Sequence, residues 1–168
     1  MDKAPILWIT GIPASGKTTL ARRLVRYFRS LGTAAEVLDG DDIRKIISSD
    51  LGFSKEDRLE NNRRIGWIAR LLARNGVMAV VASVSPYLEG RKNARDEARA
   101  DDIRFIEIYA KCSQAIAQKR DTRGIYGQKN VTGLGAPYEV PTTAEIVIYT
   151  ERVGPDEALA QVLERLAR

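Results

Sequence analysis

One glycine-rich segment near the N-terminus constrains the fold of this chain more than any other feature. It follows an apolar run and reads Gly11-Ile12-Pro13-Ala14-Ser15-Gly16-Lys17-Thr18, which matches the pattern G-x-x-x-x-G-K-[ST]. In such a loop the glycines let the backbone wrap around a phosphate, the lysine reaches the β- and γ-phosphates, and the hydroxyl residue can ligate Mg²⁺. The helix that follows directs its positive end at the same anion. The segment therefore predicts a site for ATP and Mg²⁺, with Lys17 as a catalytic group, formed by Gly11, Ala14, Ser15, Gly16, Lys17, Thr18 and Thr19.

Apolar runs and amphipathic stretches alternate along the chain, as they do in α/β domains with a parallel sheet. The apolar runs predict strands at Pro5–Thr10, Ala34–Leu38, Val77–Val84, Ile103–Ala110 and Glu145–Tyr149. The amphipathic stretches predict helices at Gly16–Leu31, Lys55–Asn75, Arg91–Ala100, Ser113–Asp121 and Pro155–Ala167. The expected fold is a three-layer P-loop NTPase-type α/β domain, in which helices flank a five-stranded parallel sheet.

The segment Thr122–Thr143 differs from the rest of the chain, because it is rich in glycine and proline and has little periodicity. A loop of that length in a small domain is usually a lid or a binding loop. A phosphate site also needs a cover that excludes water. We therefore expect a lid at about residues 122–143. The 168 residues fit one compact domain, so residues 1–168 are interpreted as a single P-loop domain.

Charge and composition narrow the choice of partners. The net charge is +5, but the basic residues are dispersed and no aromatics interleave with them, which favours a multiply charged small substrate over nucleic acid. One cysteine, Cys112, and no histidine exclude an internal disulfide and argue against zinc sites and Ser-His or Cys-His nucleophiles. The longest apolar stretch, Gly76–Val84, is too short to span a bilayer, and no apolar signal segment opens the sequence. We expect a cytoplasmic protein without a membrane partner.

Carboxylates follow the second predicted strand, where the chain reads Val37-Leu38-Asp39-Gly40-Asp41-Asp42. The carboxyl ends of the strands form the edge at which open α/β sheets bind ligands. Asp39 and Asp41 are therefore candidates to hold Mg²⁺ or to take the proton of an acceptor. The alternative is that Asp41 or Asp42 caps a short helix before Ile43. We favour a functional Asp39 and a capping Asp42.

Several motifs resemble those of the adenylylsulfate kinases, from the P-loop to about Ile148. The residues after Leu38 are similar to L-D-G-D-x-[VI]-R, and the stretch that begins at Asp50 resembles D-L-G-F-S-x-x-D-R-x-E-N-x-R-R, which few other P-loop kinases carry. Further matches are Ser85-Pro86-Tyr87, Arg120-Asp121, Gly124-Ile125-Tyr126, Thr132-Gly133 and Pro137-Tyr138-Glu139. This family moves the γ-phosphate of ATP to the 3′-hydroxyl of adenylylsulfate, giving 3′-phosphoadenylylsulfate. The resemblance implies this activity for a single kinase domain, and a homodimer is a common assembly in the family.

The resemblance also assigns an acceptor site. Arg58 and Asn61 share a helix face with Arg64 or Ile65, and cationic and amide groups suit a phosphosulfate. Phe53 either stacks on a nucleobase or anchors the core, and the resemblance favours stacking. Ser85 is implied near the transferred group and Arg120 beside the ATP base, with Asp39 positioning or deprotonating the hydroxyl. The complete implied acceptor site is Asp39, Asp41, Arg44, Phe53, Arg58, Asn61, Ser85, Pro86, Tyr87, Lys129, Val131 and Thr132.

The chain departs from the family pattern on the acceptor side. Val131 replaces the phenylalanine of F-T-G, and Ser83 replaces a phenylalanine two residues before S-P-Y. Leu88 and Gly90 replace a frequent arginine and aspartate, and a shortened lid leaves Lys129 as its obvious cation between Tyr126 and Val131. These differences leave open a related kinase that acts on another nucleotide or a phosphorylated metabolite. A nucleotide switch or nucleic-acid-binding module is a third alternative, although the chain has no N-K-x-D motif of the GTPases.

Overall fold

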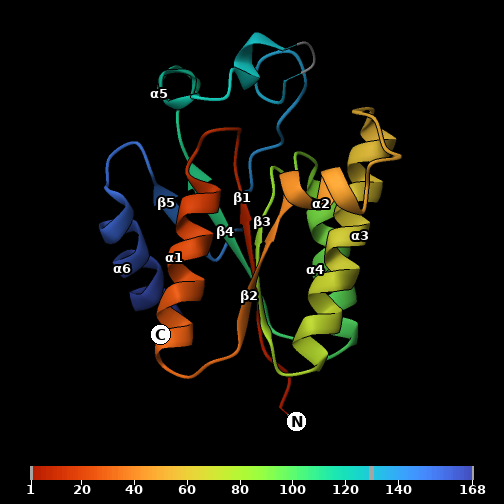
Figure 1. Ribbon diagram of the computed structural model, residues 1–168, viewed down its shortest axis with the longest axis vertical. Coiled ribbons are helices and arrows are strands. Elements are labelled where there is room, and N and C mark those ends of the chain that lie inside the picture. The colour runs from red at the N-terminus through yellow and green to blue at the C-terminus, as the bar shows by residue number, and fades with distance from the viewer. Residues whose placement is uncertain (1, 129–130, 168) are drawn as a thin grey trace.

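Within residues 2–128 and 131–167, which the computed structural model describes, five short strands form one parallel sheet in the order β2-β3-β1-β4-β5 (Figure 1). The strands are β1 (Ile6–Thr10), β2 (Ala35–Asp39), β3 (Met78–Ala82), β4 (Phe105–Lys111) and β5 (Ile146–Tyr149). All the pairings are parallel. Helices link the strands, as parallel pairing requires. The predicted α/β class and the five-stranded parallel sheet are confirmed.

Helices cover both faces of this sheet. In Figure 1, α1 (Lys17–Ser30) and α6 (Pro155–Leu166) lie on one side, and α3 (Lys55–Arg74) and α4 (Leu88–Ala100) lie on the other. Three shorter elements lie toward the upper end of the view, namely α2 (Gly40–Ile46), α5 (Gln114–Arg120) and the 3₁₀ helix η1 (Ile125–Gly127). The segments beyond the carboxyl ends of the strands thus gather at one edge.

The central strand β1 is apolar on both faces because helices cover both of its faces. Leu7 and Ile9 pack into the core beneath α1 and α6, whereas Trp8 packs into the core beneath α3 and α4. All five residues of β1 are buried. A strand covered on both faces needs a continuous apolar run, and such a run fixes its depth in the sheet. This burial places the turn after Thr10 at the middle of the carboxyl edge.

Some boundaries differ from those that the sequence predicts. The third predicted helix, which is α4 in the structure, begins at Leu88, three residues before the expected Arg91. The reason is a tertiary contact, because Leu88 N donates to Glu139 Oε2 at 2.6 Å. This acceptor lies far along the chain, so local patterning did not indicate it. The short helix α2, which the sequence indicates only as an alternative for the segment around Asp41 and Asp42, is formed.

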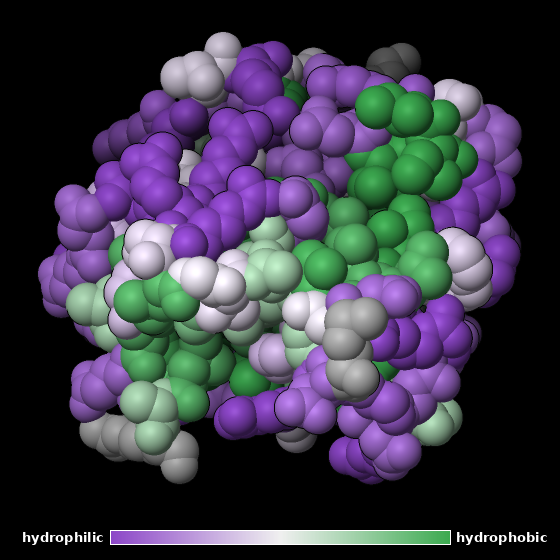
Figure 2. Space-filling view, turned by 60° about the horizontal axis from the view of Figure 1, so that its bottom comes forward, coloured by the Kyte–Doolittle hydropathy of each residue, from purple (hydrophilic) through white to green (hydrophobic). Residues whose placement is uncertain are grey.

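The surface carries apolar areas among hydrophilic ones. Figure 2 shows this mixture with the lower end of the molecule turned forward. The exposed large apolar side chains include Trp67 and Leu71, which lie four residues apart on α3. No helix in the described part of the chain has the length and apolar character needed to cross a membrane.

Candidate active site

A cavity of about 1090 Å³ opens at the carboxyl edge of the sheet. Among the described residues, its lining includes six cationic side chains and two acidic ones, Asp39 and Asp41. This imbalance favours an anionic ligand. Most of the residues predicted for the site line the cavity: Ala14, Gly16, Lys17, Thr18, Thr19, Asp39, Asp41, Arg44, Phe53, Arg58, Asn61, Ser85, Pro86, Arg120, Val131 and Thr132. Gly11, Ser15 and Tyr87 do not line it, and Lys129 lies outside the described residues.

The P-loop joins β1 to α1 through a backbone that needs its two glycines. A Cβ atom at Gly11 would lie 2.6 Å from Ala110 O and 2.7 Å from Ser15 Oγ, so no side chain fits there. Gly16 has φ 91° immediately before α1, a conformation that favours glycine. Ala14 also has a positive φ, 57°. The loop therefore turns tightly before it enters the helix.

Lys17 is the buried cation of this loop. Its side chain is 8% exposed, and its Nζ donates to the carbonyl oxygen of Ile12 at 2.7 Å. Burial lowers the pKa of Lys17 to about 8, although the charges of Asp41 and Asp39 act in the opposite direction. An anion placed beside this ammonium would compensate its lost hydration. The geometry thus fits a lysine that binds phosphate.

Asp39 connects the P-loop to α2. Its Oδ2 accepts from Thr18 Oγ1 at 2.8 Å, and its Oδ1 accepts from Asp41 N at 2.9 Å. Asp39 is therefore the N-cap of α2 as well as the partner of Thr18. The prediction that Asp42 caps this helix is wrong, because Asp42 lies inside α2 with its carboxylate 3.7 Å from Lys45. The cap lies earlier because the helix begins at Gly40.

A second contact at this end involves Arg123, which the sequence prediction missed. Its Nη1 donates to Asp41 Oδ2 at 2.6 Å, so it links the lid segment to α2. Tyr126 of the same segment donates its hydroxyl to Pro13 O at 2.9 Å. The adjacent Gly124-Ile125-Tyr126 motif marked this region, but nothing local indicated the partners of these side chains. The two contacts hold the lid segment over the P-loop.

An aromatic ring flanked by guanidinium groups forms the other end of the cavity. Phe53 is 61% exposed, which excludes the alternative that it anchors the core. Arg44 Cζ lies 4.8 Å and Arg58 Cζ 5.5 Å from the centroid of its ring. Burial, followed by the charge of Arg58, lowers the pKa of Arg44. Such a cluster suits an anion attached to an aromatic group.

Fewer residues of α3 line the cavity than the sequence predicts. Arg58 and Asn61 line the cavity. Arg64 instead binds Asp50 Oδ1 at 2.6 Å, and Ile65 is fully buried in the core. These partners of Arg64 and Ile65 lie elsewhere in the fold, so helical spacing alone does not indicate them.

Two lid residues, Val131 and Thr132, line the cavity near Arg58. Arg58 Nη1 donates to Thr132 Oγ1 at 2.8 Å. Thr132 and its neighbour Val131 are buried. Arg120 lies elsewhere on the cavity wall and donates to Thr150 O at 2.8 Å. Arg120, the last residue of α5, therefore lines the same cavity as the lid residues Val131 and Thr132.

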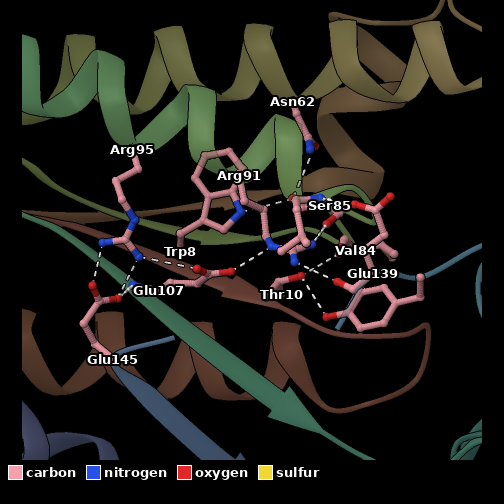
Figure 3. Close-up of polar contacts among 12 residues, drawn as sticks. Trp8, Thr10, Asn62, Val84, Ser85, Arg91, Arg95, Glu107, Glu139 and Glu145 are labelled. Atoms are coloured by element: carbon pink, nitrogen blue, oxygen red, sulfur yellow. Dashed lines mark hydrogen bonds and ion pairs between the residues drawn. The ribbon is translucent and has the colours of Figure 1, made fainter. Parts of the chain in front are cut away.

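The Ser85-Pro86-Tyr87 turn follows β3 along the cavity wall. Ser85 is 1% exposed, and its hydroxyl points toward Trp8 and Asn62 (Figure 3). The hydroxyl accepts from Trp8 Nε1 at 3.1 Å and donates to Asn62 Oδ1 at 3.2 Å. Tyr87 is buried at the N-cap of α4 and does not line the cavity. These contacts direct the serine hydroxyl into the protein.

Comparison with known proteins agrees with this geometry. Residues 3–149 match the family model described as Adenylylsulphate kinase. A probable adenylyl-sulfate kinase of Aeropyrum pernix is 43% identical over 157 residues, covering 90% of this chain and 86% of that protein. A probable bifunctional SAT/APS kinase 2 of Sorangium cellulosum is 42% identical over 96% of this chain, which spans 28% of its length.

Solved structures show the same likeness in three dimensions. The APS kinase of Mycobacterium tuberculosis, solved in complex with AMPPNP and APS, is 32% identical and has a TM-score of 0.96 over 100% of both chains. A hexameric APS kinase from Thiobacillus denitrificans is 32% identical with a TM-score of 0.76, covering 99% of this chain and 29% of that chain. With this family match over most of its length, the chain belongs to the adenylylsulfate kinase family.

Proposed function

We propose that the chain transfers the γ-phosphate of ATP to the 3′-hydroxyl of adenylylsulfate, giving ADP and 3′-phosphoadenylylsulfate. The observation that carries this proposal is one continuous cavity with two chemically different ends. The P-loop with the buried Lys17 lies at one end, and the ring of Phe53 with Arg44 and Arg58 lies at the other. The family membership supports the same assignment.

The P-loop end binds the donor nucleotide. The backbone of the loop wraps around the phosphates, and Lys17 leaves the carbonyl of Ile12 to contact the β- and γ-phosphates. Arg120 lies on the same cavity and is assigned to the side of the adenine. Catalysis of phosphoryl transfer depends mainly on positioning and on neutralisation of charge. Lys17 supplies both.

Thr18 and Asp39 form a donor set that fits Mg²⁺. A hydroxyl and a carboxylate lie 2.8 Å apart there, and Mg²⁺ prefers oxygen ligands. Asp41, two residues further on, is a candidate third ligand. The chemistry that a bound Mg²⁺ supplies is neutralisation of the phosphate oxygens. Asp39 also lies where it can orient the attacking hydroxyl or accept its proton.

The opposite end binds the acceptor. The base of adenylylsulfate stacks at Phe53, and the guanidinium groups of Arg44 and Arg58 face its phosphosulfate. Asn61 supplies an amide on the same wall. Base stacking on an aromatic ring contributes about 1–3 kcal/mol.

A second candidate acceptor follows from one position. Val131 is an aliphatic residue in the cavity wall, where the family pattern has a phenylalanine. A site that lacks this ring loses one stacking surface for a base. A related nucleotide or a phosphorylated metabolite is therefore the alternative acceptor for the same phosphoryl transfer.

Product analysis distinguishes these acceptors. The purified protein, Mg²⁺ and ATP are mixed with adenylylsulfate or with a panel of other nucleotides and phosphorylated metabolites, and the products are identified by mass spectrometry. We expect adenylylsulfate to gain one phosphoryl group while ADP is released in equal amount. ADP release with another acceptor, and none with adenylylsulfate, would assign the alternative.

The two roles of Asp39 can be separated by substitution. Asp39→Asn keeps a side-chain oxygen that caps α2, so the melting temperature should stay near that of the wild type. It removes the negative charge, so kcat should fall about 100-fold. Asp42→Asn, on the same helix, is the matched control and should leave both quantities unchanged. Wild-type kcat in Asp39→Asn would exclude Asp39 from the reaction.

The lowered pKa of Lys17 predicts how ATP affinity depends on pH. The free protein loses this proton at about pH 8, whereas a bound triphosphate favours the ammonium and raises the pKa. Affinity is therefore complete below pH 8 and falls above it, by up to about tenfold per pH unit. Calorimetric titration from neutral to alkaline pH measures this dependence together with the proton uptake.

Lys17→Arg is the control for this titration. Its guanidinium stays charged over this pH range, so the ATP affinity of this variant should not depend on pH. Wild-type affinity that stays constant well above pH 8 would show that the Lys17 ammonium does not contribute to ATP binding.

We also propose that the chain acts as one kinase domain in the cytoplasm and forms a homodimer. Cys112 is a free buried thiol, which fits a reducing compartment. The exposed Trp67 and Leu71 on α3 provide apolar surface for self-association. Sedimentation equilibrium should give twice the mass of the chain, and a monomer at all concentrations would contradict the dimer.

A further inference from the structure

The turn between β3 and α4 has an unusual backbone that several distant elements stabilise. Ser85 has φ 44°, a left-handed conformation that residues with a side chain rarely adopt. The carbonyl of Val84 accepts from Thr10 Oγ1 at 2.7 Å, and the carbonyl of Pro86 accepts from Glu139 N at 2.8 Å. A strained backbone persists only where its surroundings determine it. Residues far along the chain thus bind two carbonyls of this turn.

Arg91 occupies the centre of these contacts, as Figure 3 shows. Its Nη1 donates to Ser85 O at 2.5 Å and its Nη2 donates to Glu139 O at 2.7 Å. Its Nε lies 2.7 Å from Glu107 Oε1, and both side chains are nearly inaccessible to solvent. One buried guanidinium therefore joins the acceptor-side turn, the end of the lid and strand β4.

The last part of the lid is attached to the same turn by further contacts. Tyr138 shares a hydrogen bond of 3.1 Å with Thr10, whose hydroxyl also binds Val84. Glu139 accepts from Leu88 N and so caps α4. The guanidinium carbon of Arg91 lies 5.9 Å from the centroid of the Tyr138 ring. Several contacts therefore fasten the end of the lid to the turn.

We propose that Arg91 is a positioning residue for the acceptor side of the reaction. Its planar fork holds the carbonyls of Ser85 and Glu139 at a fixed separation, while Glu107 neutralises its charge. A lysine cannot reproduce this arrangement, because its single ammonium lacks the fork geometry. The role in catalysis rests on the proposed function, since it concerns the acceptor of that reaction. The link between the turn and the lid does not.

The competing interpretation is that the buried ion pair serves folding alone. Arg95 provides a matched comparison, because it binds the same Glu107 at 3.4 Å and also binds Glu145. Its contacts include neither the turn nor the end of the lid. A purely structural role predicts a loss of stability at either arginine with no change that is specific to the acceptor. A positioning role predicts an effect on the acceptor at Arg91 only.

The experiment compares Arg91→Lys with Arg95→Lys. For Arg91→Lys we expect kcat/KM for adenylylsulfate to fall about tenfold or more while the dissociation constant for ATP is unchanged, because a turn that is no longer held misplaces one substrate only. For Arg95→Lys we expect both constants to stay at the wild-type values. Equal effects on the two variants, or an equal loss of ATP affinity in Arg91→Lys, would overturn the proposal.

Hydrogen exchange gives a readout that needs no substrate. In the folded Arg91→Lys protein, the amide of Glu139 should exchange faster than in the wild type and in Arg95→Lys, because its acceptor on the turn is no longer held. Unchanged exchange of this amide would overturn the link between turn and lid. Wild-type protein that does not use adenylylsulfate would contradict the proposed function instead, and the exchange comparison would still test Arg91.

Discussion

The burial of the Lys17 ammonium at the carboxyl edge of the sheet is the constraint on which the site depends. In this structure the charge is held by a neutral carbonyl of its own loop, and desolvation lowers its pKa. A buried cation of this kind is costly unless an anion accompanies it. The apolar strand β1 fixes its depth, since Leu7, Trp8 and Ile9 are inaccessible to solvent on both faces of the sheet. The fold thus holds a charge that a phosphate can neutralise.

Around the cavity, single side chains each link several elements of the fold. Asp39 caps α2 and binds Thr18, so the helix and the candidate metal ligands share one geometry. Arg123 and Tyr126 connect the lid to α2 and to the P-loop. Arg91 connects the end of the lid to the Ser85-Pro86-Tyr87 turn. Side-chain contacts therefore join the lid to α2, to the P-loop and to the Ser85-Pro86-Tyr87 turn.

Much of this arrangement could be predicted from the sequence, because it depends on local chemistry. The P-loop pattern, the apolar strands and the amphipathic helices are local signals, and they located the sheet and the loop that lines the cavity. For Phe53, the residues alone left base stacking and core anchoring open; the family resemblance favoured stacking, and the ring is exposed. What could not be predicted depends on partners distant in the chain. Glu139 extends α4 by binding Leu88, and the buried position of Arg91 between Glu107 and two carbonyls has no local signal.

A crystal structure of the protein with Mg²⁺ and a non-hydrolysable ATP analogue tests the central claim most directly. The account predicts that Lys17 Nζ leaves the carbonyl of Ile12 and lies within hydrogen-bonding distance of the β- and γ-phosphates, with the amides of the loop directed at the same group. Nucleotide bound elsewhere, with Lys17 still donating to Ile12, would contradict the account.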